Sequence, residues 1–201
     1  MSESQPRPSR NLDLEGLKGL SHPLRVQLFD ALSIYGPSTA SALADRLGES
    51  SGATSYHLRQ LERHGFVREV EGRGTARERW WERVPGAVTL SPADTGDSPA
   101  GRAATMAVMR EFERNRSTLL ADFVARGFDV LPREWFEAST VGTANLRVTA
   151  EQLTGIVDSW QSWAKETLEP FRDQNLPDTL PVQIHFNAFP VLDGEQKENQ
   201  S

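Results

Sequence analysis

Residues 50–70, SSGATSYHLRQLERHGFVREV, contain the stretch that decides the fold. Small hydroxyl residues and a glycine open it, and Thr54, Leu58 and Leu61 recur at the spacing of one helical face. A helix that only packs a core has little use for such small residues at its start. A helix that approaches a large anion does, because small side chains let first-turn N–H groups reach phosphate oxygens. We therefore predict a helix over 51–64 whose N-terminal end meets nucleic acid.

The segments before this helix predict three more helices. A short one is expected over 12–20, and a second begins at Ser21-His22-Pro23 and ends at Gly36-Pro37. A third, over 39–47, has Ser38 or Thr39 as its cap. It is separated from the 51–64 helix by three or four residues that include a glycine, as a helix-turn-helix motif requires.

After this helix, the spacing of apolar residues changes from that of a helix to that of strands. FVREV (66–70) and RERWWERV (77–84) read as strands, and EGRGTA between them supplies two glycines for a turn. The order of helices followed by a hairpin is that of a winged helix-turn-helix. We assign residues 12–85 to this domain.

The predicted DNA contacts lie on the exposed side of the 51–64 helix and on the wing. Arg59 could reach guanine O6 and N7, Tyr56 a base edge or a phosphate, and the wing arginines phosphates or a minor groove. As alternatives, Arg59 could belong to a solvated face paired with Glu62, and Tyr56 could be half-buried against the wing. His57 is expected to be packed or capping. The predicted DNA-binding residues are Ser51, Gly52, Ser55, Tyr56, Arg59, Arg73, Arg77 and Arg79.

The second half of the chain predicts a separate region. Residues 86–100 read as a linker, and residues 101–192 as a dimerisation and effector domain. Its expected elements are a helix at 101–126, one or two turns at 132–139, and a capped helix at 150–173 between strands at 144–149 and 182–189. The last three would form a β-α-β unit. The fold class is mainly α with a small β part (α+β), and residues 1–11 and 193–201 are expected to be disordered.

Aromatic residues are frequent in this second region. They suit a small core, which is the default interpretation, and they also suit a pocket for a small apolar ligand. The candidate effector-binding residues are Trp135, Trp160 and Trp163. Trp163 lies off the main apolar stripe of its helix.

Composition excludes several classes of protein. The 201 residues include no Cys, and the four His at 22, 57, 64 and 185 are scattered, so no metal site is predicted. Neither a phosphate-binding glycine motif nor a catalytic constellation occurs, so no cofactor and no catalysis are expected. Nothing resembles a signal peptide or a membrane span, so we expect a cytoplasmic protein without a membrane partner.

Charge is distributed unevenly along the chain. The net charge is −6, yet residues 1–84 carry 12 Lys and Arg against 11 Asp and Glu, while residues 85–201 carry 10 against 17. The acidic half would suit a basic protein partner, so the alternative function is a winged-helix protein-interaction module. Arg73, Arg77 and Arg79 favour phosphates over that alternative, although acidic residues lie between them.

Several stretches together resemble ArsR-type winged-helix transcriptional regulators. They are LSHPLRVQLFDAL, TASALADRLG, SGATSYHLRQLERHGFV and a Gly/Arg wing ending in RERWW, over roughly residues 12–84. The resemblance implies a bacterial homodimer that represses promoters through a palindromic site in double-stranded DNA, with the 51–64 helix as recognition helix. Metal-sensing members carry Cys in the helix before it, or ligands on a C-terminal helix. Residues 42–48, ALADRLG, have no Cys, so the chain resembles a non-metal-sensing member with an extended C-terminal region.

Overall fold

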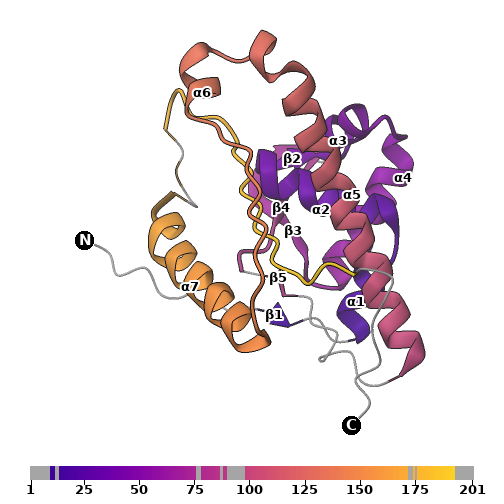
Figure 1. Ribbon diagram of the computed structural model, residues 1–201. Coiled ribbons are helices and arrows are strands. Elements are labelled where there is room, and N and C mark those ends of the chain that lie inside the picture. Colours follow the sequence, from indigo (N-terminus) through magenta and orange to yellow (C-terminus); the bar gives the residue numbers. More distant parts are fainter. Residues whose placement is uncertain are drawn as a thin grey trace. The chain divides into compact units, whose positions relative to one another are not determined.

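The computed structural model describes residues 10–11, 14–75, 78–86, 88–89, 98–171, 174 and 176–192 (Figure 1). Two compact units divide the chain, Met1–Ser139 and Thr140–Ser201. Arg77, most of the predicted linker, and residues 1–9 and 193–201 lie outside the described residues. The prediction of disorder was wrong for Arg10–Asn11, which form a short strand, β1, that pairs in parallel with β5 (Val88–Thr89).

Four helices open the first unit at the predicted places. They are α1 (Leu14–Leu20), α2 (Pro23–Tyr35), α3 (Ala40–Leu47) and α4 (Ser51–Arg63). The side chains of His22, Thr39 and Ser50 cap α2, α3 and α4, and each accepts a hydrogen bond of 3.2 Å from a first-turn backbone N–H. Only residues 48–50 separate α3 from α4. The predicted helix-turn-helix is therefore confirmed.

A three-stranded antiparallel sheet follows, in the order β2-β4-β3. β3 (Val67–Thr75) and β4 (Glu78–Arg83) form the predicted hairpin, and β2 (Ser38–Thr39) pairs with the other edge of β4. β2 is too short to give a sequence signal. β3 also runs through the residues predicted as a turn, where Gly74 has φ 107° and a side chain would collide with the Glu78 carbonyl oxygen.

Helix α5 (Pro99–Val130) completes the core of this unit. Val108 is 1 % exposed and Phe112 is 8 % exposed, and both belong to the same hydrophobic cluster as α1, α2, α4 and β4. The compact unit consequently extends to Ser139, past the boundary expected at 86–100. The remaining buried apolar residues of the cluster are Leu17, Leu20, Leu24, Val26, Leu28, Phe29, Ala31, Leu32, Leu43, Leu58, Leu61, Phe66, Val67 and Trp81.

Two polar contacts also tie α5 to α2. Asn115 donates a hydrogen bond of 3.0 Å to the carboxylate of Asp30, and Gln27 donates one of 3.4 Å to Glu111. Burial raises the pKa of Asp30, an effect that its bond from Asn115 opposes. A short helix, α6 (Arg133–Glu137), ends the unit close to the predicted turns at 132–139.

The second unit contains α7 (Ala150–Leu168), which continues into the 3-10 turn η1 (Glu169–Phe171). Thr149 and Gln152 form the predicted capping box. The strands predicted at 144–149 and 182–189 were wrong, because both segments are extended without a hydrogen-bonded ladder (Figure 1). Alternating side chains define two faces of a chain, but a strand also needs a backbone partner. The β-α-β unit is therefore absent from the described residues of this chain.

None of the described helices is long and apolar enough to cross a membrane.

Candidate nucleic-acid interface

Helix α4 presents one buried face and one exposed face. Thr54, Leu58 and Leu61 are each 0 % exposed, as predicted from their spacing. Tyr56 lies on the opposite side and is 57 % exposed, so it is not half-buried against the wing. Among the other predicted contacts on this helix, Ser51, Gly52 and Arg59 are exposed. Ser55 is half-buried.

The start of α4 is open to a ligand. Ser50 caps the backbone N–H of Ala53, and the two residues between them, Ser51 and Gly52, are exposed. A Cβ on Gly52 would meet no atom within 4 Å, and its φ is not positive, so neither packing nor backbone conformation requires a glycine here. Glycine costs a helix stability relative to alanine. The space beside Gly52 is open to solvent.

The arginines of α4 have free guanidinium groups. Within the described part of the chain, Arg59 and Arg63 form neither an ion pair nor a hydrogen bond. The alternative in which Arg59 pairs with Glu62 is therefore not seen. Arg59 lies on the exposed face one turn after Ser55, where an arginine beside a helix N-terminal half can reach a base edge.

The wing arginines differ in their surroundings. The Arg73 guanidinium lies 3.6 Å from the centroid of the Trp80 ring, whereas Arg79 forms a 3.2 Å ion pair with Glu69. Trp81 faces the core at 2 % exposure, so the two tryptophans point to opposite sides of β4. Both members of the Arg79–Glu69 pair are exposed, and exposed pairs contribute little and exchange readily. The Arg73 guanidinium, which lies on the Trp80 ring, could therefore bind an anion without breaking an ion pair. Arg79 would first have to leave Glu69.

A group of rings joins α4 to the start of α2. The His57 ring lies 4.2 Å from that of His22 and 5.1 Å, edge-on, from that of Tyr56. Burial lowers the pKa of His57, and the nearby His22 and Arg25 lower it further. The prediction that His57 is packed is thus met. Sequence reasoning missed its partner, because residues 22 and 57 are brought together only by the packing of α2 on α4.

The aromatic residues predicted to bind an effector fall in two places. Trp160 and Trp163 lie 4.9 Å apart on α7, and Trp160 stacks on Phe186 at 4.5 Å. Trp135 lies on α6, which belongs to the other unit.

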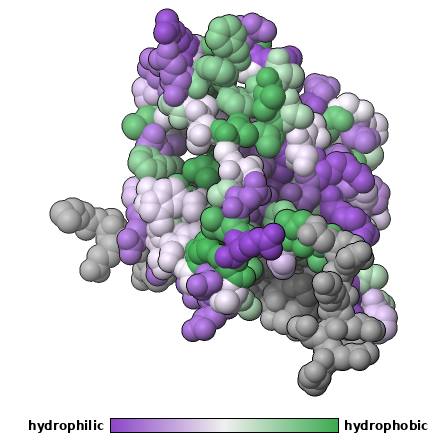
Figure 2. Space-filling model, in the orientation of Figure 1, coloured by the Kyte–Doolittle hydropathy of each residue, from purple (hydrophilic) through white to green (hydrophobic). Residues whose placement is uncertain are grey.

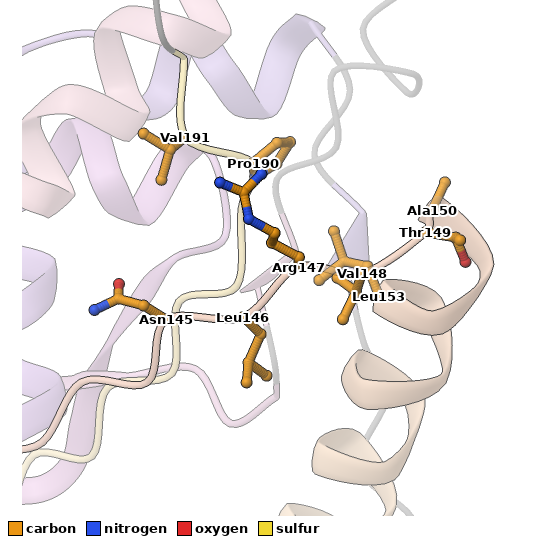
Figure 3. Close-up of a pocket in the computed structure, with 9 residues that line it drawn as sticks. All are labelled: Asn145, Leu146, Arg147, Val148, Thr149, Ala150, Leu153, Pro190 and Val191. Atoms are coloured by element: carbon orange, nitrogen blue, oxygen red, sulfur yellow. The ribbon is translucent and has the colours of Figure 1, made fainter.

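The second unit also has an open hollow of about 700 Å³. Figure 3 shows Val148 and Leu153 at the start of α7, with Pro190 and Val191 on the second extended segment. Arg147 is the charged residue of this lining. The three predicted tryptophans do not contribute to it. Among the described residues, no group of three or more His, Cys, Asp or Glu could hold a metal ion.

Comparison with known proteins agrees with this geometry. A family described as a helix-turn-helix domain matches residues 20–70. That range spans α2, α3, α4 and the first residues of β3. The four helices and the hairpin that follows them form a winged helix-turn-helix, and residues 20–70 within it match the helix-turn-helix domain family. No curated protein matches the chain.

Three solved structures of bacterial proteins show a weak similarity to this chain. A homodimeric winged helix-turn-helix fragment of Mb0332 from Mycobacterium bovis, a possible ArsR-family regulator, is 20 % identical with a TM-score of 0.31, over 54 % of this chain and 77 % of that one. The transcriptional regulator Tm0710 from Thermotoga maritima is 14 % identical with a TM-score of 0.30, over 80 % and 89 %. The heme sensor PefR from Streptococcus agalactiae is 13 % identical with a TM-score of 0.30, over 80 % and 83 %.

Proposed function

We propose that this chain is a homodimeric transcriptional repressor that binds a palindromic operator in bacterial cytoplasm. The exposed N-terminal half of α4 is the observation that carries the proposal. It combines an open backbone at Gly52, the exposed ring of Tyr56 and the unpaired guanidinium of Arg59 on one side of a helix-turn-helix. The repressor role is taken from the resemblance of residues 12–84 to ArsR-type regulators.

Each part of this surface has a distinct role in the proposal. First-turn N–H groups and the hydroxyl of Ser51 bind phosphate, which fixes the orientation of α4 in the major groove. Arg59 reads guanine through two parallel hydrogen bonds, and Tyr56 contacts a neighbouring base edge or phosphate. Arg73, Arg77 and Arg79 of the wing bind the flanking backbone. Ser55, beside Tyr56, contributes a further hydroxyl at the groove.

An exposed apolar stripe on α5 supports the dimer. It lies on a different face from the buried Val108 and Phe112, and apolar surface reaches the end of α5 at the top of Figure 2. An apolar stripe of this kind on a long helix suits pairing with its symmetry mate. In such a C₂ dimer the recognition helices contact half-sites about 34 Å apart, one turn of DNA. The stripe consists of Met106 and Met109 in the first third of the helix and Leu120, Val124 and Phe128 in its last third, each at least 37 % exposed, with the Arg116–Glu113 ion pair on the same face between the two groups.

We further propose that the second unit binds a small apolar effector. The stacked rings of Trp160 and Phe186 and the hollow beside the start of α7 support this role. Trp135 stays a candidate from the sequence alone.

Selection of genomic fragments with the purified full chain at about 150 mM salt tests the function, because this salt suppresses weak non-specific binding. We expect enrichment of a palindrome whose half-sites are one helical turn apart. Failure of the folded chain to enrich any sequence would count against specific DNA binding and in favour of a protein partner.

Arg59→Ala tests which residue reads the sequence. It should cost about 1–3 kcal/mol and relax the preference at one base position. Arg63→Ala is the matched control, because Arg63 is an equally unpaired arginine at the far end of the same helix. An unchanged base preference in Arg59→Ala would remove Arg59 from base reading.

A further inference from the structure

His57 occupies the centre of a small stack of rings at the surface that the proposed function assigns to DNA. Its ring lies 4.2 Å from the His22 ring, inclined by 33°, and 5.1 Å from the Tyr56 ring, inclined by 77°. Both outer rings are exposed, whereas His57 between them is half-buried. The conformation of the exposed Tyr56 ring is consequently limited by the ring of His57 behind it.

The other end of this stack is fixed to the backbone of α2. Nδ1 of His22 accepts a hydrogen bond of 3.2 Å from the Leu24 N–H and so caps the helix. The stack therefore connects a fixed helix cap, through His57, to a predicted base-contacting residue.

The surroundings of His57 favour its neutral form. The titratable and charged groups that face it are His22 and Arg25 from α2, Glu49 from the turn before α4, and its neighbour Tyr56. The Arg25 guanidinium is held in place by hydrogen bonds to the Lys18 carbonyl oxygen (2.7 Å) and the Ser21 hydroxyl (3.3 Å).

The ring nitrogens of His57 add a second reason. Its Nδ1 is buried and has no hydrogen-bond partner among the described residues. A proton on that atom would be a buried donor without an acceptor, next to the positive charge of Arg25. The neutral ring is therefore the form that fits between His22 and Tyr56.

We propose that His57 is a positioning residue for DNA recognition, whose neutral ring holds Tyr56 in its binding conformation and whose protonation releases it. The proposal rests on the proposed function, since it assumes that Tyr56 contacts DNA. Its consequence is that acidification weakens operator binding. This direction is diagnostic, because added positive charge on a DNA-binding surface ordinarily strengthens binding to phosphates.

The test is a measurement of operator affinity against pH at constant ionic strength. Fluorescence anisotropy with the operator recovered by the genomic selection gives Kd at pH 7.5, 6.5 and 5.5, and circular dichroism at each pH establishes that the chain is folded. We expect the Kd of the wild-type chain to rise about tenfold between pH 7.5 and 5.5. A Kd that is constant or falls on acidification would overturn the proposal.

Two variants separate the positioning role from a general structural one. His57→Phe keeps a flat ring between its neighbours but cannot be protonated, so its Kd should match the wild type at pH 7.5 and stay within about twofold at pH 5.5. His57→Ala removes the ring and should bind about tenfold more weakly at every pH. If the Phe variant does not fold, His57→Gln replaces it; this variant is also neutral but lacks the ring, so it should bind more weakly than the wild type at pH 7.5 and show no further loss at pH 5.5.

His185→Gln is the control, because His185 lies in the other unit. It should keep the full pH dependence of the wild type. Persistence of that dependence in His57→Phe would assign it to another group and overturn the proposal. A folded wild-type chain that binds no operator at any pH, including 7.5, would instead show that the proposed function itself has failed.

Discussion

Replacing Gly52 by alanine should change stability and DNA binding in opposite directions. The residue lies in the first turn of α4, its φ is not positive, and an added Cβ meets no atom within 4 Å. Alanine therefore fits the free protein and gains about 0.5 kcal/mol, less than the full glycine-to-alanine difference because the site is at a helix end. For a unit of this size, that gain raises Tm by about 1–2 °C.

The same methyl group occupies the space through which the duplex approaches. Loss of one charge-assisted hydrogen bond between a backbone N–H and a phosphate costs about 1.5–3 kcal/mol, and a dimer loses it in two half-sites. We therefore expect the operator Kd of Gly52→Ala to rise at least about a hundredfold, because two losses of about 1.5 kcal/mol add to about 3 kcal/mol and about 1.4 kcal/mol corresponds to a factor of ten. Thermal denaturation and fluorescence anisotropy measure the two effects.

Gly155 offers a matched control for this substitution. It is also an exposed helical glycine whose added Cβ meets no atom within 4 Å, but it lies on α7. Gly155→Ala should stabilise the protein and leave DNA affinity unchanged. If Gly52→Ala binds the operator as tightly as the wild type while gaining stability, the start of α4 does not approach DNA and the reasoning is refuted.

Three further predictions concern the dimer, the wing and pH. Val124→Asp, in the C-terminal part of the exposed α5 stripe, should give a monomer by sedimentation at concentrations where the wild type is dimeric. Glu69→Gln should free Arg79 for phosphate in both protomers, which lowers Kd and steepens the dependence of log K on log salt by about two for the dimer. The pKa of His57 is lowered in the folded state, so on acidification the unfolded chain binds a proton at His57 before the folded chain does. The free energy of unfolding should therefore fall as pH drops below about 6.5, the ordinary pKa of histidine. Chemical denaturation of the wild type and of His57→Phe between pH 7.5 and 5.5 measures this loss, which the variant should not show.

Nearby residues supply the controls for the first two of these predictions. Ala125→Asp introduces the same charge beside Val124 on a different face of α5 and should leave the dimer intact. Glu82→Gln removes the same charge as Glu69→Gln but releases Arg68, which pairs with Glu82 at 2.7 Å. Equal effects of the two glutamine variants would mean that net charge, and not Arg79, sets the affinity.

Local signals were sufficient to predict the helix-turn-helix and its wing. These signals extend over a few residues only, so they can be recognised in the sequence without knowledge of the tertiary structure. Examples are the helix cap Thr39, the helix end at Gly48 and the helical spacing of Thr54, Leu58 and Leu61. The exposed positions of Tyr56 and Arg59 followed from the same spacing. For this reason the part of the candidate site on α4 could be predicted from sequence.

Features that depend on distant contacts could not be predicted in this way. The pairing of β2 with β4, the stacking of His22 on His57, and the docking of Val108 in the core each join residues far apart in the chain. The expected strand at 182–189 shows the opposite failure. Its alternation is a local signal, but the ladder partner that a strand requires is absent from the described chain.

In the proposed dimer, helix α5 sets the distance between the two DNA-binding surfaces. At 1.5 Å per residue its 32 residues extend over about 48 Å. One of its faces is fixed to the DNA-binding core by Val108 and Phe112, and another carries the stripe proposed to meet the partner chain. In that dimer, the distance between the two recognition helices is set by a single continuous helix from each copy. A small rotation of α5 against α2 would therefore change the operator spacing that the dimer fits, without altering any residue that touches DNA.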